Sequence, residues 1–120
     1  MTPERLDDAT LDLQEHARRF TDEVLIPLEV EVEMADGKLS EEAVERVKRE
    51  ALAAGLTGGL HAREHGGQGW PRLQWALVAE QFGRSTNAIH WHVPNAYNVW
   101  AHGSPAQIDR YLRPALRGEL

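Results

Sequence analysis

The sequence predicts an all-α fold of five to six mostly antiparallel helices in one domain. Apolar residues recur at steps of three and four along most of the chain, which places them on one face of a helix. Residues that favour helix starts and ends stand between these runs, and the strict alternation typical of strands is nearly absent. The length of 120 residues, with 42% hydrophobic and 27% charged residues, is that of a single globular domain.

The first predicted helix covers about residues 8–34. Pro27 lies inside its apolar pattern and has no backbone N–H, so we expect the helix to kink or break there. Residues 35–38, ADGK, form the turn that follows. The expected buried face consists of Leu13, Ala17, Phe20, Val24 and Leu28.

The second helix is marked at both ends. Ser40 is a suitable N-cap, and Glu41 and Glu42 complement the positive end of the helix dipole. Gly55 is suited to a left-handed C-cap. Residues 55–70 then hold six glycines in sixteen positions, and because each internal glycine costs a helix about 1 kcal/mol relative to alanine, we expect a loop.

The third helix follows Pro71 and ends near Gly83. Glu80 lies on the predicted apolar face of this helix, and we expect it to form an ion pair with Arg84 rather than to act as a base. The other predicted members of that face are Leu73, Ala76 and Leu77.

The remaining chain holds a segment at 87–102, interrupted by Pro94, and a last helix. Ser104 is its expected N-cap, Pro105 takes the first helical position, and Gln107 completes a capping box. Its expected buried side consists of Ile108, Tyr111, Leu112 and Leu116.

Residues 61–65, HAREH, fit the H-x-x-E-H pattern of a class of zinc peptidases. Glycines flank the motif on both sides, so a single turn cannot preorganise two histidines, and the sequence nominates no third ligand. We therefore expect a glycine-rich connector and no metal site. The GGQG at 66–69 lacks the preceding strand and the G-K-[ST] ending of a phosphate loop.

The composition argues against several partners. A formal net charge of −6 disfavours binding to nucleic acid and to anionic membranes, and no apolar run approaches the about 20 residues that span a bilayer. The chain has no cysteine, and its N-terminal residues lack the apolar stretch of a signal peptide. We expect a cytoplasmic protein.

Five short motifs follow one another in a characteristic order from about residue 11 to residue 120. Each motif alone is loose, but five in order with suitable gaps are specific. The motif residues are Phe20, Glu23 and Pro27; Ala54, Gly55, Leu56 and Gly59; Gly66, Gly67 and Gly69; Leu73, Ala76, Leu77, Glu80, Gly83 and Arg84; and Gly103, Ser104, Gln107, Tyr111, Leu112, Leu116, Gly118 and Glu119.

This order resembles the N-terminal helical domain of the acyl-CoA dehydrogenase family. The resemblance implies an oxidoreductase of fatty acid metabolism that carries out α,β-dehydrogenation of acyl-CoA with FAD as cofactor. It also implies that residues 1–120 correspond to the first domain only, without the flavin β-domain and the C-terminal helical domain that carries the catalytic base. We therefore expect no FAD binding and no catalysis by this chain alone.

The family's acyl pocket is partly walled by the fourth segment of this domain. On that resemblance Asn87, His90, Trp91 and Pro94 are the candidate substrate-pocket residues, and their three- and four-residue steps suit one helical turn. The alternative is that Trp91 is an ordinary core residue. We expect no catalytic, cofactor-binding or metal-binding residue in the chain.

A second hypothesis is a stand-alone helical interaction module that self-associates or binds a partner chain. A domain that lacks its natural neighbours exposes a large apolar patch, and such patches drive association. Trp70, Trp75 and Trp100 are the candidates for that patch. The expected partners are thus the missing domains or another chain, with a homo-oligomer as the expected state.

Overall fold

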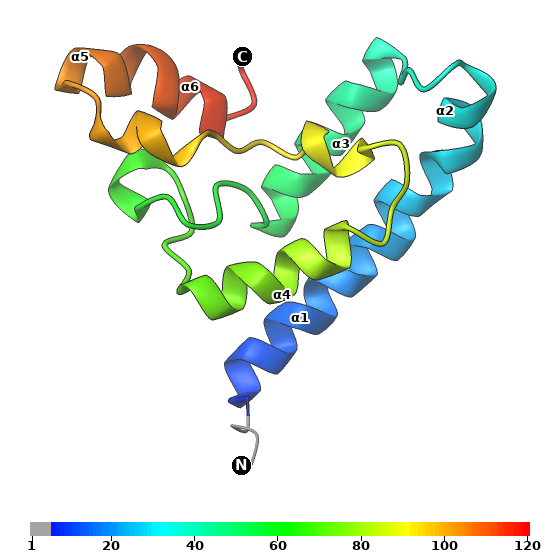
Figure 1. Cartoon of the computed structure of the whole chain (residues 1–120), viewed down its shortest axis with the longest axis horizontal. Coiled ribbons are helices and arrows are strands. Elements are labelled where there is room, and N and C mark those ends of the chain that lie inside the picture. The colour runs from blue at the N-terminus through cyan, green and yellow to red at the C-terminus, as the bar shows by residue number, and fades with distance from the viewer. Residues whose placement is uncertain (1–5) are drawn as a thin grey trace.

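The computed structural model describes residues 6–120, and within this range it contains helices and turns but no strand (Figure 1). The all-α prediction is confirmed. The α-helical segments in chain order are α1 (Asp8–Phe20), α2 (Glu29–Met34), α3 (Glu41–Ala54), α4 (Arg72–Phe82), α5 (Pro105–Gln107) and α6 (Arg113–Leu116).

The first predicted helix is one rod with an irregular middle. A π-turn at Thr21–Leu25 and a 3₁₀ turn at Ile26–Leu28 join α1 to α2. Pro27 explains the irregularity, because its ring would clash with the carbonyl four residues earlier in a regular helix. The wider π-turn, closed by the Ile26 N–H on the Thr21 carbonyl, accommodates it.

The same arrangement recurs near the C-terminus. A π-turn at Ile108–Leu112 joins α5 to α6 and stands just before Pro114. The predicted start of this helix is confirmed: Ser104 and Gln107 form a reciprocal capping box, and Pro105 follows the cap. Of the predicted buried side, Leu112 and Leu116 are buried, whereas Tyr111 is 44% exposed.

The caps of α3 are also confirmed. The Ser40 hydroxyl accepts a hydrogen bond from the Ala43 N–H, and Gly55 adopts a left-handed φ of 69°. His16 of α1 then holds the C-terminal end of α3, because its Nε2 lies 2.7 Å from the Ala54 carbonyl, which can only accept a hydrogen bond.

Helices α1 and α4 pack side by side and run parallel. Gln74 donates to the Thr10 hydroxyl near the start of both helices, and Phe20 contacts Phe82 at their ends with ring centroids 5.8 Å apart. A parallel pair requires a long connection, and α3 with the glycine-rich loop provides it.

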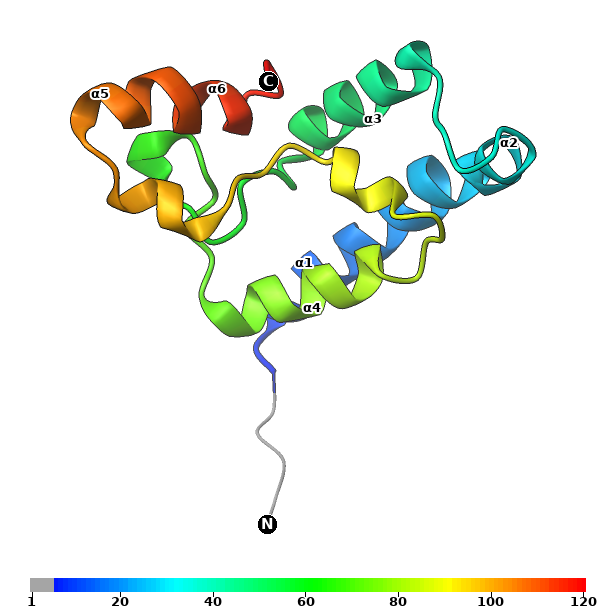
Figure 2. The same cartoon turned by 45° about the horizontal axis from the view of Figure 1, so that its top comes forward.

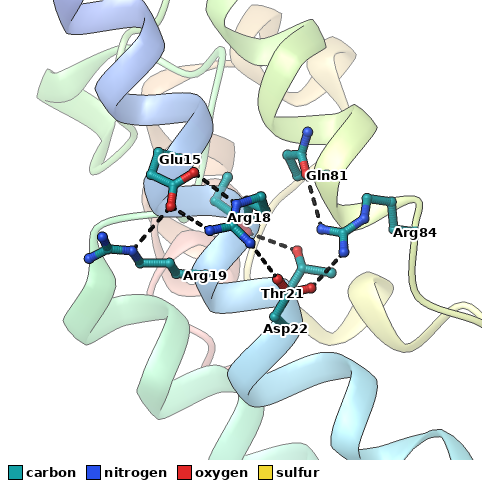
Figure 3. Close-up of polar contacts among 8 residues, drawn as sticks. Glu15, Arg18, Arg19, Thr21, Asp22, Gln81 and Arg84 are labelled. Carbon is teal, nitrogen blue, oxygen red and sulfur yellow. Dashed lines mark hydrogen bonds and ion pairs between the residues drawn. The ribbon is translucent and has the colours of Figure 1, made fainter.

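A polar network ties the end of α1 to the end of α4 (Figure 3). Asp22 accepts hydrogen bonds from Arg18 at 2.9 Å and from Arg84 at 2.6 Å. Arg18 also binds Glu15 and, through that hydrogen bond, holds the pKa of the Glu15 carboxyl down at about 2.

The structure corrects two predictions about α4. Arg84 reaches Asp22 and Gln81 instead of Glu80, and Glu80 is exposed. The predicted face of α4 is wrong as well, because Leu73 is 53% exposed and Ala76 is exposed. The helix turns its other side inward, with Val78, Gln81 and Phe82 buried.

The main core lies between α1, α3, α4 and the turn at Ile89–His92, and the C-terminal helix packs separately on the glycine-rich loop. Leu116 is buried there, and a Cβ placed on Gly58 would lie 3.1 Å from its side chain. Arg113 donates to the Glu64 carbonyl of the same loop. The core residues are Ala17, Phe20, Val24, Leu25, Leu28, Val32, Ala43, Val47, Ala51, Leu56, Val78, Phe82, Ile89 and Val93.

Candidate functional site

An open groove of about 620 Å³ lies between the main core and the C-terminal helix. Figure 2 shows the segment 89–102 passing between α3 and α4, and the groove follows this segment. Its walls come from four parts of the chain that are distant in sequence. The lining includes Lys48, Trp75, Phe82, His90, Trp91, His92, Pro94, Tyr97, Trp100, Gly118 and Leu120.

The structure brings three of the four candidate pocket residues together. His90, Trp91 and Pro94 line the groove. Asn87 lies outside it, where its side-chain amide donates to Glu33 Oε2 at 3.0 Å. Trp91 is 78% exposed, so the alternative that it is an ordinary core residue is wrong.

The prediction that Trp70, Trp75 and Trp100 form the exposed apolar patch is wrong. Trp70 and Trp75 are half-buried and stack with centroids 6.4 Å apart, and Trp100 is half-buried between Tyr97 and Tyr111. The most exposed large apolar side chains near the groove are Trp91, Tyr97 at 76%, Val99 at 69% and Leu120 at 64%.

The ionisable side chains that line the groove are basic rather than acidic, in contrast to the acidic chain as a whole. Of the described residues that line it, none is Asp or Glu, although the chain has 19 acids and a net charge of −6. Its ionisable nitrogen groups are Lys48, His90 and His92. Burial lowers the pKa of His90, and burial together with the nearby Lys48 ammonium lowers the pKa of His92.

The lowered pKa values of His90 and His92 predict a loss of stability in mild acid. As the pH falls below about 6.5, the unfolded chain protonates these histidines before the folded chain does, so the free energy of unfolding decreases until the folded state also protonates. Urea denaturation between pH 8 and pH 5 measures it. The double variant His90→Asn, His92→Asn should lose less stability over this range, and an unchanged pH dependence would assign the loss to other groups.

The glycine-rich loop is folded on itself beside the groove. His61 is buried, and its Nε2 donates to the Ala96 carbonyl at 2.8 Å, while the Gly58 N–H donates to the Pro94 carbonyl at 3.0 Å. These bonds hold the groove segment against the loop. Sequence reasoning assigned His61 to a polar connector and missed this role.

The amides of the GGQG stretch are engaged inside the loop. The Gly67 N–H donates to Ala62 and the Gly69 N–H to His61, both to backbone carbonyls. They are therefore not directed at a bound phosphate, in contrast to a phosphate loop. Within the described part of the chain, no three His, Cys, Asp or Glu side chains come together as a metal site would require.

The family model described as "Acyl-CoA dehydrogenase, N-terminal domain" matches residues 7–119. The chain belongs to the acyl-CoA dehydrogenase family. This N-terminal domain is 36% identical over 123 residues to the (R)-benzylsuccinyl-CoA dehydrogenase of Thauera aromatica, a match that covers 90% of this chain. The chain spans 30% of the length of that relative. No solved structure matches the chain.

Within residues 6–120 of this acyl-CoA dehydrogenase domain, no helix has the length and apolar character needed to cross a membrane.

Proposed function

We propose that the chain is the N-terminal helical domain of an FAD-dependent acyl-CoA dehydrogenase, which oxidises the α,β carbon–carbon bond of an acyl-CoA thioester. In this role it forms part of the acyl pocket wall and the interface to the flavin β-domain and the C-terminal helical domain. The observation that carries the proposal is the open, aromatic-lined groove in a chain of this family. We propose a cytoplasmic enzyme.

Exposed apolar residues support a wall that other domains complete. Trp91, Tyr97 and Leu120 line the groove and are each more than half exposed. Leu73 is exposed on α4, whose own inward face is already packed. Exposed apolar patches of this kind mark surfaces that another part of a protein covers.

We propose that the described residues do not bind FAD by themselves. The glycine-rich loop uses its amides internally, and the groove offers aromatic and imidazole side chains with Lys48 as its one primary amine among the described residues. We therefore propose that the flavin and the catalytic base belong to the other domains of the enzyme. The chain contributes shape, apolar surface and exclusion of water around the acyl group.

The aromatic side chains of the groove favour an acyl group with an aromatic ring. Trp75, Phe82, Trp91, Tyr97 and Trp100 all contribute to its lining. Aromatic side chains bind rings through edge-to-face and offset-stacked contacts. The relative from Thauera aromatica is named for (R)-benzylsuccinyl-CoA, and we propose an aromatic acyl-CoA as the substrate class here.

A chimera tests the proposed function. The chain replaces the matching part of the Thauera aromatica relative, and turnover is measured as acyl-CoA-dependent reduction of an artificial electron acceptor. We expect turnover by the chimera and none by the relative's remainder alone. Flavin content and circular dichroism check folding, and a folded, flavin-loaded chimera without turnover would contradict the proposal.

A titration of the pure chain with FAD distinguishes a wall domain, which has no cofactor site of its own, from a protein that binds FAD unaided. The four tryptophans report binding, since three of them line the groove. We expect no saturable quenching and no oxidation of acyl-CoA by the chain alone. Saturable FAD binding or stoichiometric acyl-CoA oxidation would contradict the assignment as a wall domain.

The alternative, a stand-alone helical interaction module, rests on the same exposed residues. We propose that the chain self-associates through the surface around Trp91, Tyr97 and Leu120. Sedimentation velocity measures the oligomeric state. A monomer at all concentrations would remove the support for both self-association and the alternative module.

A further inference from the structure

The groove has a basic feature that the apolar wall does not explain. Lys48 lines it from α3, and its side chain is only 20% exposed. The aliphatic part of this side chain lies under the turn at Gly118, because a Cβ placed on Gly118 would lie 3.5 Å from Lys48 Cδ and 3.2 Å from Pro94 Cγ. This packing holds the stem of Lys48 in the wall of the groove.

Lys48 lacks a strong protein partner among the described residues. Its Nζ lies 3.8 Å from Glu45 Oε1, and the Glu45 side chain is 69% exposed. Exposed ion pairs of this kind contribute about 0–1 kcal/mol, so the ammonium group remains available to a ligand. His92 lies close enough for this ammonium group to influence it, and its neutral imidazole offers a second hydrogen-bonding group.

We propose that Lys48 forms a carboxylate-binding end of the groove and selects an acyl group that carries both an aromatic ring and a second carboxylate. This inference rests on the proposed function, because it names the substrate class of the same groove. The absence of acids from the described lining in a chain of net charge −6 provides the charge complementarity. A half-buried ammonium group strengthens its pairing with an anion relative to bulk water.

The aromatic part of the site is separate from Lys48 in sequence and comes from α4 and residues 97–100. Tyr97 and Trp100 stand edge to face with centroids 6.0 Å apart, and Trp75 lines the same groove. Because Lys48 and these rings line one groove, our proposal is that a ring joined to a short dicarboxylate contacts both parts. The phosphates of coenzyme A are the other possible anion, and a single ammonium group beside aromatic rings suits one carboxylate better than several phosphates.

Binding to the pure 120-residue chain tests this inference. The probes are benzylsuccinate, succinate and the neutral aromatic 4-phenyl-1-butanol, followed by calorimetry and tryptophan fluorescence. We expect benzylsuccinate to bind about tenfold more tightly than either of the others, since a charge-assisted hydrogen bond adds to the ring contacts. The variant Lys48→Gln should bind benzylsuccinate no better than the neutral alcohol, and Lys48→Arg should retain most of the affinity.

The matched control is Lys38→Gln, because Lys38 is the other lysine of the chain and lies exposed in a turn. It changes the net charge equally and should bind like the wild type. Three results would overturn the inference. The first is no benzylsuccinate binding up to about 10 mM, which is weaker than specific recognition requires. The second is an equal loss of benzylsuccinate affinity in both glutamine variants, and the third is displacement of bound benzylsuccinate by adenosine 3′,5′-bisphosphate in a manner that depends on Lys48. The chimera experiment measures turnover, whereas this experiment measures binding. Failure of the proposed function is therefore distinguishable from failure of the inference about Lys48.

Discussion

Replacing Gly67 with alanine should destabilise the domain by about 3 kcal/mol, as severe overpacking does. A Cβ at this position would lie 2.2 Å from the His61 carbonyl oxygen and 2.6 Å from the Gly58 carbonyl oxygen. Both obstacles are backbone atoms, so no side-chain rotation can relieve the contact. Urea denaturation followed by circular dichroism measures the loss, which is large against the total of about 6–18 kcal/mol expected for a domain of this length.

Gly69→Ala is the matched control in the same loop. Gly69 has a φ of +64°, but a Cβ there would lie at ordinary contact distances of 3.5 Å from Arg63 Cγ and 3.9 Å from the Arg63 backbone N. Alanine at this position should cost about 1 kcal/mol, the strain of a left-handed residue. Equal losses in the two variants would mean that backbone strain, rather than close packing of the loop, makes these glycines necessary.

The helix ends and the proline breaks could be predicted because they depend on neighbouring residues. Ser40 caps the helix that begins one residue later, and Gly55 ends it with a left-handed turn. Pro27 acts on the carbonyl four residues before it. Interactions of this range can be read from the sequence, and the all-α fold follows from them.

The inward face of α4 could not be predicted because it depends on a distant helix. The pattern at Leu73, Ala76 and Leu77 has the helical period, but α1 packs on the opposite side through Phe82. An apolar face that contacts another domain and one that contacts the core have the same period in sequence.

The groove was predicted only in its local part. His90, Trp91 and Pro94 belong to one short segment and were found together from the family resemblance. Lys48 and Trp75 come from other helices, and their place in the lining depends on how α3 and α4 pack. The sequence signal that could have found Lys48 is its position one residue after buried Val47, on a helix whose other face is polar.

Replacing His61 with alanine should cost about 3 kcal/mol and loosen one wall of the groove. The substitution removes a buried ring and leaves the part-buried Ala96 carbonyl without its donor at 2.8 Å. Loss of the hydrogen bond and the resulting cavity each destabilise the folded state. Hydrogen exchange should accelerate at the Gly58 amide, which donates to Pro94 in the same contact. His61→Gln keeps a side-chain N–H donor and should lose less stability than alanine.

His65, the second histidine of the H-x-x-E-H motif, distinguishes this structural role from a metal site. The described structure gives His65 Nδ1 no hydrogen-bond partner, and the contact of Nε2 with Glu64 is a loose 3.9 Å. His65→Ala should therefore destabilise the domain much less than His61→Ala. A zinc site requires both histidines, so it predicts equal losses and a melting temperature that rises with added zinc in the wild type alone. Unequal losses without a zinc effect would establish that His61 serves to hold the groove segment.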